Sequence, residues 1–194
     1  MNNSNVPQRP IEYSYWVVPG KILTGEYPRN KDDESSLKKI GALEKAGIEI
    51  ILDLTESDEG LEPYSTMLHS ATHHRFPITD VSTPKNHDDM KKILDTIDEH
   101  VAQERCVYIH CWGGVGRTGT VVGCWLARHK GGGEAGLKAL RKLWLTCPKS
   151  AWRKSPETSE QENYILKWVS PTTQFYCLRR PNFLERKFGS KNFP

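Results

Sequence analysis

A cysteine and an arginine separated by five residues are the side chains of this sequence best suited to chemistry. They lie in the stretch HCWGGVGRT, residues 110–118. Its three glycines let the backbone turn tightly, so that peptide N–H groups can point inward. A ring of such amides beside a helix N-terminus binds anions, and phosphate is the usual ligand. The stretch therefore predicts a phosphate-binding loop that carries a nucleophilic thiol.

Each side chain of this loop has an expected role. A helix N-terminus and a nearby cation favour the thiolate over the thiol, so Cys111 is expected to be ionised at neutral pH and to attack phosphorus. Arg117 has a planar guanidinium that grips two phosphate oxygens at once, which a lysine cannot do. Thr118 is expected to hydrogen-bond the sulfur, and His110 to fix the loop through backbone groups. The expected substrate-binding residues of the loop are Trp112, Gly113, Gly114, Val115, Gly116 and Arg117.

Two predicted elements hold the loop in place. Residues 106–109 form a short β-branched and aromatic run that predicts a buried strand. Residues 119–130 predict a helix, whose apolar side consists of Val121, Val122, Trp125 and Leu126. The cysteine therefore ends a strand, and the arginine lies where a helix opens.

Cys-x5-Arg-Thr after a histidine, between a strand and a helix, resembles the loop of the cysteine-dependent phosphatases of the protein tyrosine phosphatase superfamily. The resemblance is to the dual-specificity type and covers residues 15–169. The alternative is a glycine-rich turn with a buried cysteine and a surface arginine. The agreement of the histidine, cysteine, glycines, arginine and threonine favours the phosphatase interpretation.

Displacement of an alkoxide or phenoxide requires a group that protonates the leaving oxygen. Asp80 is the best candidate, since it follows a predicted strand at residues 75–78 and precedes Pro84 by four residues. This Asp-x3-Pro arrangement resembles the general-acid loop of the family. The tyrosine-specific branch has Trp-Pro immediately before the aspartate, whereas this chain has Ile78-Thr79.

Two further aspartates compete with Asp80 for this role. In this alternative, Asp80 only caps a turn, and Asp88 or Asp89 is the general acid. Both lie at the start of a predicted helix, where the helix dipole alone favours carboxylates. Position and context favour Asp80.

The covalent phosphocysteine must then be hydrolysed, with ionised Asp80 as the base toward water. Residues 155–161 resemble the segment that, in the tyrosine-specific branch, carries two glutamines that orient this water. Gln161 matches the second glutamine, but Glu157 stands at the first. Alternatively, Thr158 caps the last helix and residues 157–161 are its solvated first turn. Both interpretations remain open for Gln161, and capping is favoured for Glu157.

The rest of the chain alternates strands and helices, which predicts an α/β fold. We expect a central mixed sheet of about four to five strands flanked by helices, as in dual-specificity phosphatases. The expected strands are residues 16–18, 21–25, 48–54, 75–78 and 106–109, and the expected helices are residues 33–46, 86–104, 119–130, 135–145 and 158–169. His69, His73 and His74 are interpreted as a partly exposed helix and loop face rather than a metal site, because no carboxylate or cysteine joins them at ligand spacing.

The predicted organisation is a flexible lead at residues 1–14, a phosphatase domain at 15–169 and a basic tail at 170–194. The tail has five basic side chains and one acidic one, so its net charge is +4, whereas the net charge of the whole chain is +3. The remainder is near neutral, and nucleic-acid binding is not expected. A length of 194 residues suits one domain.

Composition indicates the compartment. No apolar run approaches the about 20 residues that span a membrane, and the polar N-terminus lacks the apolar core of a signal peptide. The five cysteines have neither disulfide-framework nor zinc spacing. We therefore expect a cytoplasmic protein in a reducing environment that uses no metal or organic cofactor.

The expected substrate is a phosphate monoester, foremost phosphotyrosine and then phosphoserine or phosphothreonine of proteins. A phosphoinositide or inositol-phosphate phosphatase would use the same chemistry, but its loop often carries lysines between the cysteine and the arginine. A silent phosphate-binding module would be expected to lack the cysteine, the arginine or the acid. A rhodanese-like sulfur carrier needs neither an upstream acid nor the Arg-Thr pair. The sequence leaves the substrate preference, the role of the tail and the oligomeric state open.

Overall fold

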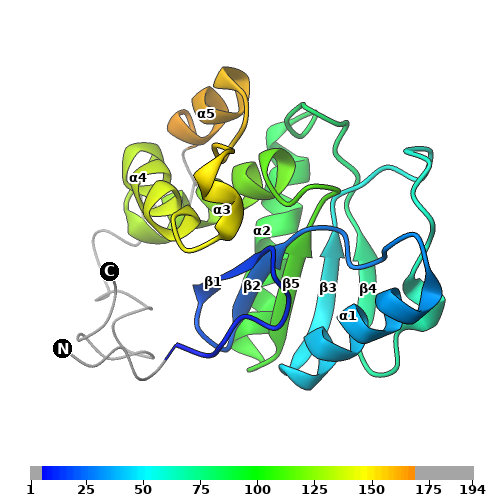
Figure 1. Cartoon of the computed structure of the whole chain (residues 1–194). Coiled ribbons are helices and arrows are strands. Elements are labelled where there is room, and N and C mark those ends of the chain that lie inside the picture. Colours follow the sequence, from blue (N-terminus) through cyan, green and yellow to red (C-terminus); the bar gives the residue numbers. More distant parts are fainter. Residues whose placement is uncertain (1–5, 169–194) are drawn as a thin grey trace.

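The computed structural model describes residues 6–168, so the predicted basic tail lies outside the described residues. Within them, five strands form one mixed sheet in the order β1-β2-β5-β3-β4 (Figure 1). The strands are β1 Ser14–Val18, β2 Ile22–Gly25, β3 Ile48–Asp53, β4 Thr72–Arg75 and β5 Cys106–His110. β1 and β2 are antiparallel, and the other neighbouring strands pair in parallel. The predicted mixed α/β sheet is confirmed.

The helices begin where side chains cap them. Asp32, Asn86 and Thr158 each accept a hydrogen bond from an amide of the first turn that follows. The helices are α1 Asp33–Lys45, α2 His87–Ala102, α3 Gly116–Lys130, α4 Gly133–Trp144 and α5 Ser159–Leu166, with short 3₁₀ turns at η1 Ser65–Met67 and η2 Pro148–Ala151. α3 starts three residues before the predicted boundary. Its first residues belong to the glycine-rich run, which lacks the apolar pattern from which the helix was predicted.

The sheet separates two apolar cores. Successive side chains of a strand point to opposite faces, so Ile50 and Leu52 of β3 belong to one core and Ile51 to the other. The larger core lies under α2, α3, α4 and α5, and the smaller one lies under α1. Figure 1 shows α1 in front of the sheet and α2 behind it.

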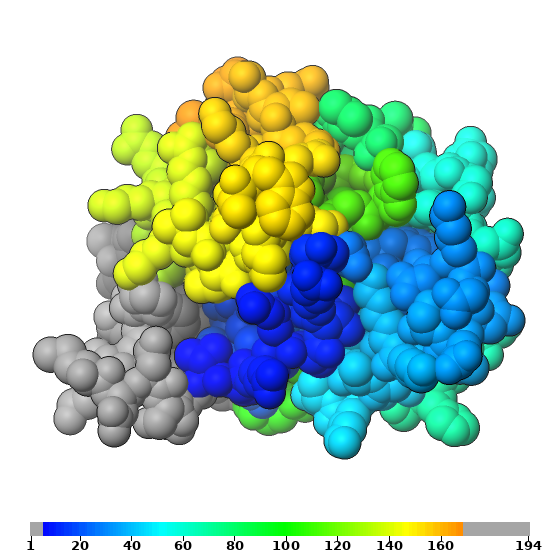
Figure 2. Space-filling view, viewed as in Figure 1, coloured from blue at the N-terminus to red at the C-terminus, as the bar shows by residue number. Residues whose placement is uncertain are grey.

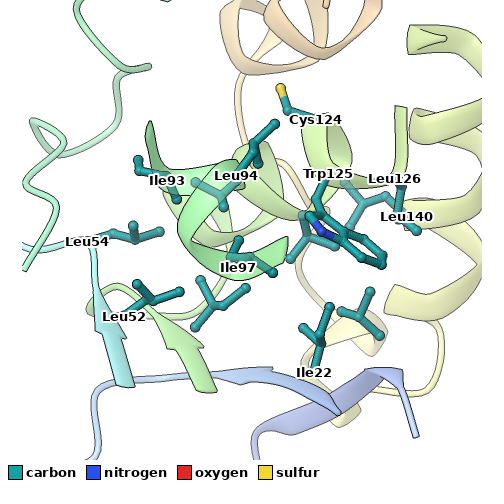
Figure 3. Packing of buried hydrophobic residues seen from close by; sticks show 14 of the residues in the cluster. Ile22, Leu52, Leu54, Ile93, Leu94, Ile97, Cys124, Trp125, Leu126 and Leu140 are labelled. Atoms are coloured by element: carbon teal, nitrogen blue, oxygen red, sulfur yellow. The ribbon is translucent and has the colours of Figure 1, made fainter. Parts of the chain in front are cut away.

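The larger core fixes α3, the helix that follows β5. Figure 3 shows side chains from three elements meeting between the sheet and the helices: Leu52 of β3, Ile93, Leu94 and Ile97 of α2, and Trp125 of α3. Burial of one large apolar side chain contributes about 1.5–3 kcal/mol. α3 is therefore held against the sheet along its length, and its N-terminus cannot easily move away from the end of β5.

Two expectations about the edges of the domain were wrong. β4 is Thr72–Arg75 rather than residues 75–78, and His73 and His74 lie on it. It is an edge strand with polar side chains, so the apolar pattern that marks a buried strand is absent there. Residues 6–14 are not merely a lead, because Ile11 is buried in the smaller core and Arg9 donates a hydrogen bond to Thr146 O at 2.8 Å.

Candidate active site

The candidate nucleophile lies between β5 and α3, as predicted. Cys111 follows the last residue of β5 and is 4% exposed. The loop ends at Gly116, where α3 begins. Gly114 has a φ of +69°, and a Cβ there would lie 2.3 Å from the Gly25 carbonyl oxygen. Only glycine fits this position, because both the backbone conformation and the space exclude a side chain.

The carbonyl groups of this phosphate-binding loop (residues 111–116) are engaged by the surrounding chain. Four hydrogen bonds engage them: His110 Nδ1 donates to Cys111 O at 3.1 Å, Tyr27 N to Trp112 O at 2.8 Å, Lys149 Nζ to Gly113 O at 2.8 Å and Ser155 Oγ to Val115 O at 2.8 Å. In residues 6–168, the peptide N–H groups of residues 112–118 have no protein acceptor. These amides and the first turn of α3 are therefore available to an anion.

Lys149 joins the back of the loop to the N-terminal part of the chain. Its Nζ lies 2.8 Å from a carboxylate oxygen of Glu26 and 4.7 Å from the ring centroid of Tyr13. Lys39 contacts the other oxygen of Glu26 at 2.6 Å. Figure 2 shows the segment after α4, in yellow, lying against the N-terminal segment in dark blue. These contacts hold the loop at Gly113.

Arg117 is 1% exposed, and its guanidinium is held along one edge. Nη1 and Nη2 donate to the two carboxylate oxygens of Glu59, the second at 2.9 Å, and Nη1 also donates to Ile78 O at 3.0 Å. Nη2 also contacts Asp80 Oδ1 at 2.9 Å. Nε is buried and has no hydrogen-bond partner among the described residues. The Nε–Nη2 edge is therefore the one that can bind two oxygens of a phosphate.

Glu59 was not predicted from the sequence, where it is one of several acids in the loop after β3. Burial alone would raise the pKa of Glu59, but the hydrogen bond from Arg117 and that from the Glu56 amide bring it below the ordinary value. The carboxylate stays ionised and fixes the orientation of the guanidinium. The only signal in the sequence was the acidity of residues 55–63, which does not single out one residue.

The structure brings Asp80 to the phosphate-binding loop. Its side chain is half exposed and forms the ion pair with Arg117 described above. Asp88 and Asp89 instead lie in the first turn of α2, where the Asp89 amide donates to the capping Asn86 side chain at 2.8 Å. Of the three aspartates considered, Asp80 is the one in contact with a residue of the site.

A buried network beneath the loop holds His110. The Cys111 carbonyl can only accept, so the His110 proton is on Nδ1, and Nε2 accepts from the Tyr64 hydroxyl at 2.6 Å. Burial lowers the pKa of His110 to about 4, although Asp53 opposes the shift. His110 is therefore neutral at physiological pH. The predicted contact between this histidine and a backbone group of the loop is confirmed.

This histidine predicts a pH dependence of stability. Between its ordinary pKa of 6.5 and the folded value of about 4, the unfolded chain binds a proton at His110 that the folded protein does not bind. The free energy of unfolding should therefore fall as the pH drops through this window, by roughly 3 kcal/mol in all. Urea titrations near pH 7 and near pH 5 measure the slope. His110→Asn should flatten it, and an unchanged slope in that variant would exclude this origin.

Thr118 and Gln161 differ from expectation. The Thr118 hydroxyl is buried and has no hydrogen-bond partner within residues 6–168, so the predicted bond to the Cys111 sulfur is not formed here. Gln161, expected among the substrate-binding residues, is fully buried and takes part in a capping box with Thr158. The capping geometry considered from the sequence is therefore present, but the first turn of α5 is not solvated at Gln161.

Glu157 borders the loop from the α5 side. A Cβ on Gly116 would lie 2.0 Å from Glu157 Oε1, so a side chain there would displace the Glu157 carboxylate. Glu157 Oε2 pairs with Arg153 at 2.6 Å. Lys149, which contacts the loop at Gly113 O, and Arg153, which contacts Glu157, thus each pair with a carboxylate.

Other kinds of site find little support in the described part of the chain. Residues 6–168 contain no group of three or more histidine, cysteine, aspartate or glutamate side chains placed to hold a metal ion. None of the described helices has both the length and the apolar character needed to cross a membrane. The cysteines at 106, 111, 124 and 147 are free thiols.

The chain matches one family model and is similar to several known proteins. Residues 11–165 match the model of the Swiss Army Knife protein DSP-PTPase phosphatase domain, PTP-SAK. An uncharacterized protein of Methanocaldococcus jannaschii is 34% identical over 48% of this chain and 56% of its own length. The putative tyrosine phosphatase 067L of Invertebrate iridescent virus 3 is 30% identical over 58% of this chain and 45% of its own length. Phosphatidylglycerophosphate phosphatase PTPMT2 of Arabidopsis thaliana is 29% identical over 61% and 50%. The matches thus span about half the length of these curated relatives.

Solved structures share the fold. The active form of Tk-PTP matches with a TM-score of 0.63 at 22% identity, covering 79% of this chain and 93% of that one. PTPMT1 in complex with PI(5)P matches with a TM-score of 0.61 at 13% identity, covering 86% and 98%. At these identities the likeness concerns the fold alone.

Proposed function

The chain belongs to the PTP-SAK family of DSP-PTPase phosphatase domains, and from this premise we propose that it hydrolyses phosphate monoesters through a cysteinyl-phosphate intermediate. The observation that carries the proposal is the guanidinium of Arg117. Glu59 fixes one edge, and Asp80 shares the other edge, whose Nε has no hydrogen-bond partner among the described residues. A phosphate-binding fork and a carboxyl group thus meet beside the loop that carries Cys111.

In the first step, the phosphate takes the Nε–Nη2 edge of Arg117 and displaces Asp80 from Nη2. Its remaining oxygens accept hydrogen bonds from the amides of residues 112–117. The Cys111 thiolate attacks phosphorus, and the new S–P bond forms as the P–O bond to the leaving group breaks. A protonated Asp80 gives its proton to the departing oxygen, which leaves as an alcohol or phenol.

In the second step, the intermediate is hydrolysed. Ionised Asp80 takes a proton from water, the water oxygen bonds to phosphorus, and the S–P bond breaks. The thiolate is stabilised by the loop amides and by the Thr118 hydroxyl, which has no other hydrogen-bond partner among the described residues. Asp80 ends the cycle protonated, and inorganic phosphate leaves.

Phosphorylated protein side chains are the proposed substrates. The loop residues between Cys111 and Arg117 are uncharged, Lys149 shares the Glu26 carboxylate with Lys39, and Arg153 is paired with Glu157. Such a site suits one phosphate better than several. A lipid phosphate is the second candidate, favoured by the relative named as a phosphatidylglycerophosphate phosphatase and by the PTPMT1 complex with PI(5)P.

Steady-state assays with a chelator present test the proposal. The substrates are a phosphotyrosine peptide, a phosphothreonine peptide, PI(5)P in vesicles and a soluble inositol phosphate. We expect the highest kcat/KM for the phosphotyrosine peptide. A higher value for PI(5)P would establish the lipid alternative. Phosphate binding without turnover of any substrate would identify a silent module.

Asp80→Asn should lower kcat about 10²–10⁴-fold, the usual contribution of general acid catalysis. The loss should shrink for an aryl phosphate with an acidic leaving group, because that group departs without protonation. The basic limb of the pH–rate profile should flatten, and the acidic limb should persist. Asp88→Asn and Asp89→Asn are matched controls and should be nearly silent. If one of these showed the leaving-group dependence and Asp80→Asn did not, the acid would have been misassigned.

A further inference from the structure

We propose that Gln161 is a positioning residue for the acid. Its side-chain amide holds the acid loop, residues 79–84, in the arrangement that directs Asp80 to the phosphate site. This inference rests on the phosphatase function proposed above, and it gives Gln161 a role distinct from the orientation of water.

The orientation of the Gln161 amide is determined by its neighbours. Oε1 accepts from the amides of Glu157 at 3.2 Å and Thr158 at 3.3 Å. Because both neighbours are donors, the oxygen must lie on this side and Nε2 on the other. Nε2 donates to Ser82 O at 3.0 Å, two residues after Asp80. The fully buried amide thus joins the start of α5 to the acid loop.

The acid loop needs such a contact because its own backbone is strained. Val81 has a φ of +59°, a left-handed conformation that a β-branched residue rarely adopts. Its side chain is 54% exposed, so burial contributes little to offset the strain. Inside the loop, the Ser82 amide donates to Thr79 O at 3.1 Å. A strained turn persists only when its surroundings hold it, and the Gln161 amide supplies such a contact.

The far end of this contact is anchored to the phosphate-binding loop. Ser155 donates to Val115 O at 2.8 Å, and Glu157 packs against Gly116. The Glu157 amide in turn donates to Gln161. A continuous path therefore runs from the phosphate-binding loop through residues 155–157 and Gln161 to Ser82. It fixes the distance between the loop that binds phosphate and the loop that carries the acid.

α5 and the residues just after it also contact the chain beyond the acid loop. The Tyr164 hydroxyl donates to Asn86 O at 3.4 Å, and the ring of Trp168 stacks on that of His87 at 4.2 Å between centroids. These contacts fix the segment where α2 begins. Loss of the Gln161 contact should therefore release the acid loop locally while α2 and α5 remain folded.

The central experiment compares Gln161→Leu with Thr158→Ala. Both remove part of the α5 cap, but only the first removes the donor to Ser82 O. For a phenyl phosphate with a poor leaving group, Gln161→Leu should lower kcat about 10-fold, part of the contribution of the acid, with KM nearly unchanged. For an activated aryl phosphate the loss should nearly vanish. Thr158→Ala should lower Tm but leave both kcat values at the wild-type level.

Gln161→Glu separates the two roles of the residue within one side chain. Glutamate is the usual partner in a capping box, so it keeps the acceptor for both amides. As a carboxylate, assayed near pH 8, it has no proton to donate to Ser82 O. It should therefore reproduce the leaving-group dependence of Gln161→Leu with a smaller loss of Tm. This variant keeps the test valid if Gln161→Leu fails to fold.

Hydrogen exchange supplies a readout that does not depend on activity. Amides of residues 79–83 should exchange faster in both Gln161 variants than in the wild type or in Thr158→Ala. Unchanged exchange, or equal kcat losses for poor and activated leaving groups, would overturn the positioning role. Wild-type protein that hydrolyses neither phosphate ester would instead overturn the proposed function, so the two failures are distinguishable.

Discussion

Replacement of Cys111 with serine should abolish turnover and preserve anion binding. A serine hydroxyl is hardly ionised at neutral pH and is a far weaker nucleophile than a thiolate, so kcat should fall about 10⁴-fold or more. The groups that bind phosphate remain, because the loop amides and Arg117 are unaffected by the loss of the sulfur. Steady-state kinetics measure the first effect. Calorimetric titration with inorganic phosphate or vanadate measures the second.

Cys147→Ser is the matched control for this prediction. Cys147 is also a buried free thiol, but it lies outside the phosphate-binding loop. Its replacement should lower Tm and leave kcat close to the wild-type value. Turnover near wild type in Cys111→Ser would contradict covalent catalysis by this cysteine. Loss of both turnover and anion binding would indicate that the loop itself had collapsed.

The parts of the site predicted from the sequence are those that neighbouring residues determine. Residues 110–118 combine a strand end, glycines and a helix start, so their spacing alone places Cys111 and Arg117 on one loop. The helix predicted at residues 86–104 was found as α2 because its apolar side chains recur with helical periodicity, and Met90, Ile93, Leu94, Ile97 and Val101 are buried. Asp80 was predicted from its position four residues before Pro84, although the strand expected directly before it lies earlier, at Thr72–Arg75.

The parts that were missed depend on contacts between residues distant in the sequence. Glu59 lies 58 residues before Arg117, and no local pattern distinguishes it from the other acids of its loop. The contact between Gln161 and Ser82 spans 79 residues and depends on how α5 docks beside the acid loop. β4 was misplaced because its polar edge position removes the apolar alternation by which strands are recognised.

Arg117→Lys is expected to have the second-largest effect on activity. A guanidinium can bind Glu59 with one edge and a phosphate with the other, whereas an ammonium is a single point charge. Lysine at this position would stay with Glu59, whose carboxylate is ionised and close, and the phosphate would lose its bidentate partner. Loss of such a donor, together with its alignment, should lower kcat/KM by about 10³-fold.

Arg128→Lys is the matched control, since it makes the same change on the same helix. Arg128 also pairs with two carboxylates, those of Asp95 and Asp98, each at 2.8 Å. These carboxylates belong to α2, so this variant should keep wild-type kcat/KM and change only Tm. The pair of variants separates the loss of an arginine from the loss of the fork at the phosphate site.

Glu59→Gln tests whether Glu59 orients the Arg117 guanidinium through one edge while the other edge binds phosphate. A neutral amide still accepts from Arg117 but no longer holds it by charge, so kcat should fall about 10-fold and less than in Arg117→Lys. In the double variant, the loss should be smaller than the product of the two single losses, because both substitutions act on one guanidinium. Multiplicative losses would mean that Glu59 acts elsewhere. Wild-type kcat/KM in Arg117→Lys would mean that the fork does not bind the transferred phosphoryl group.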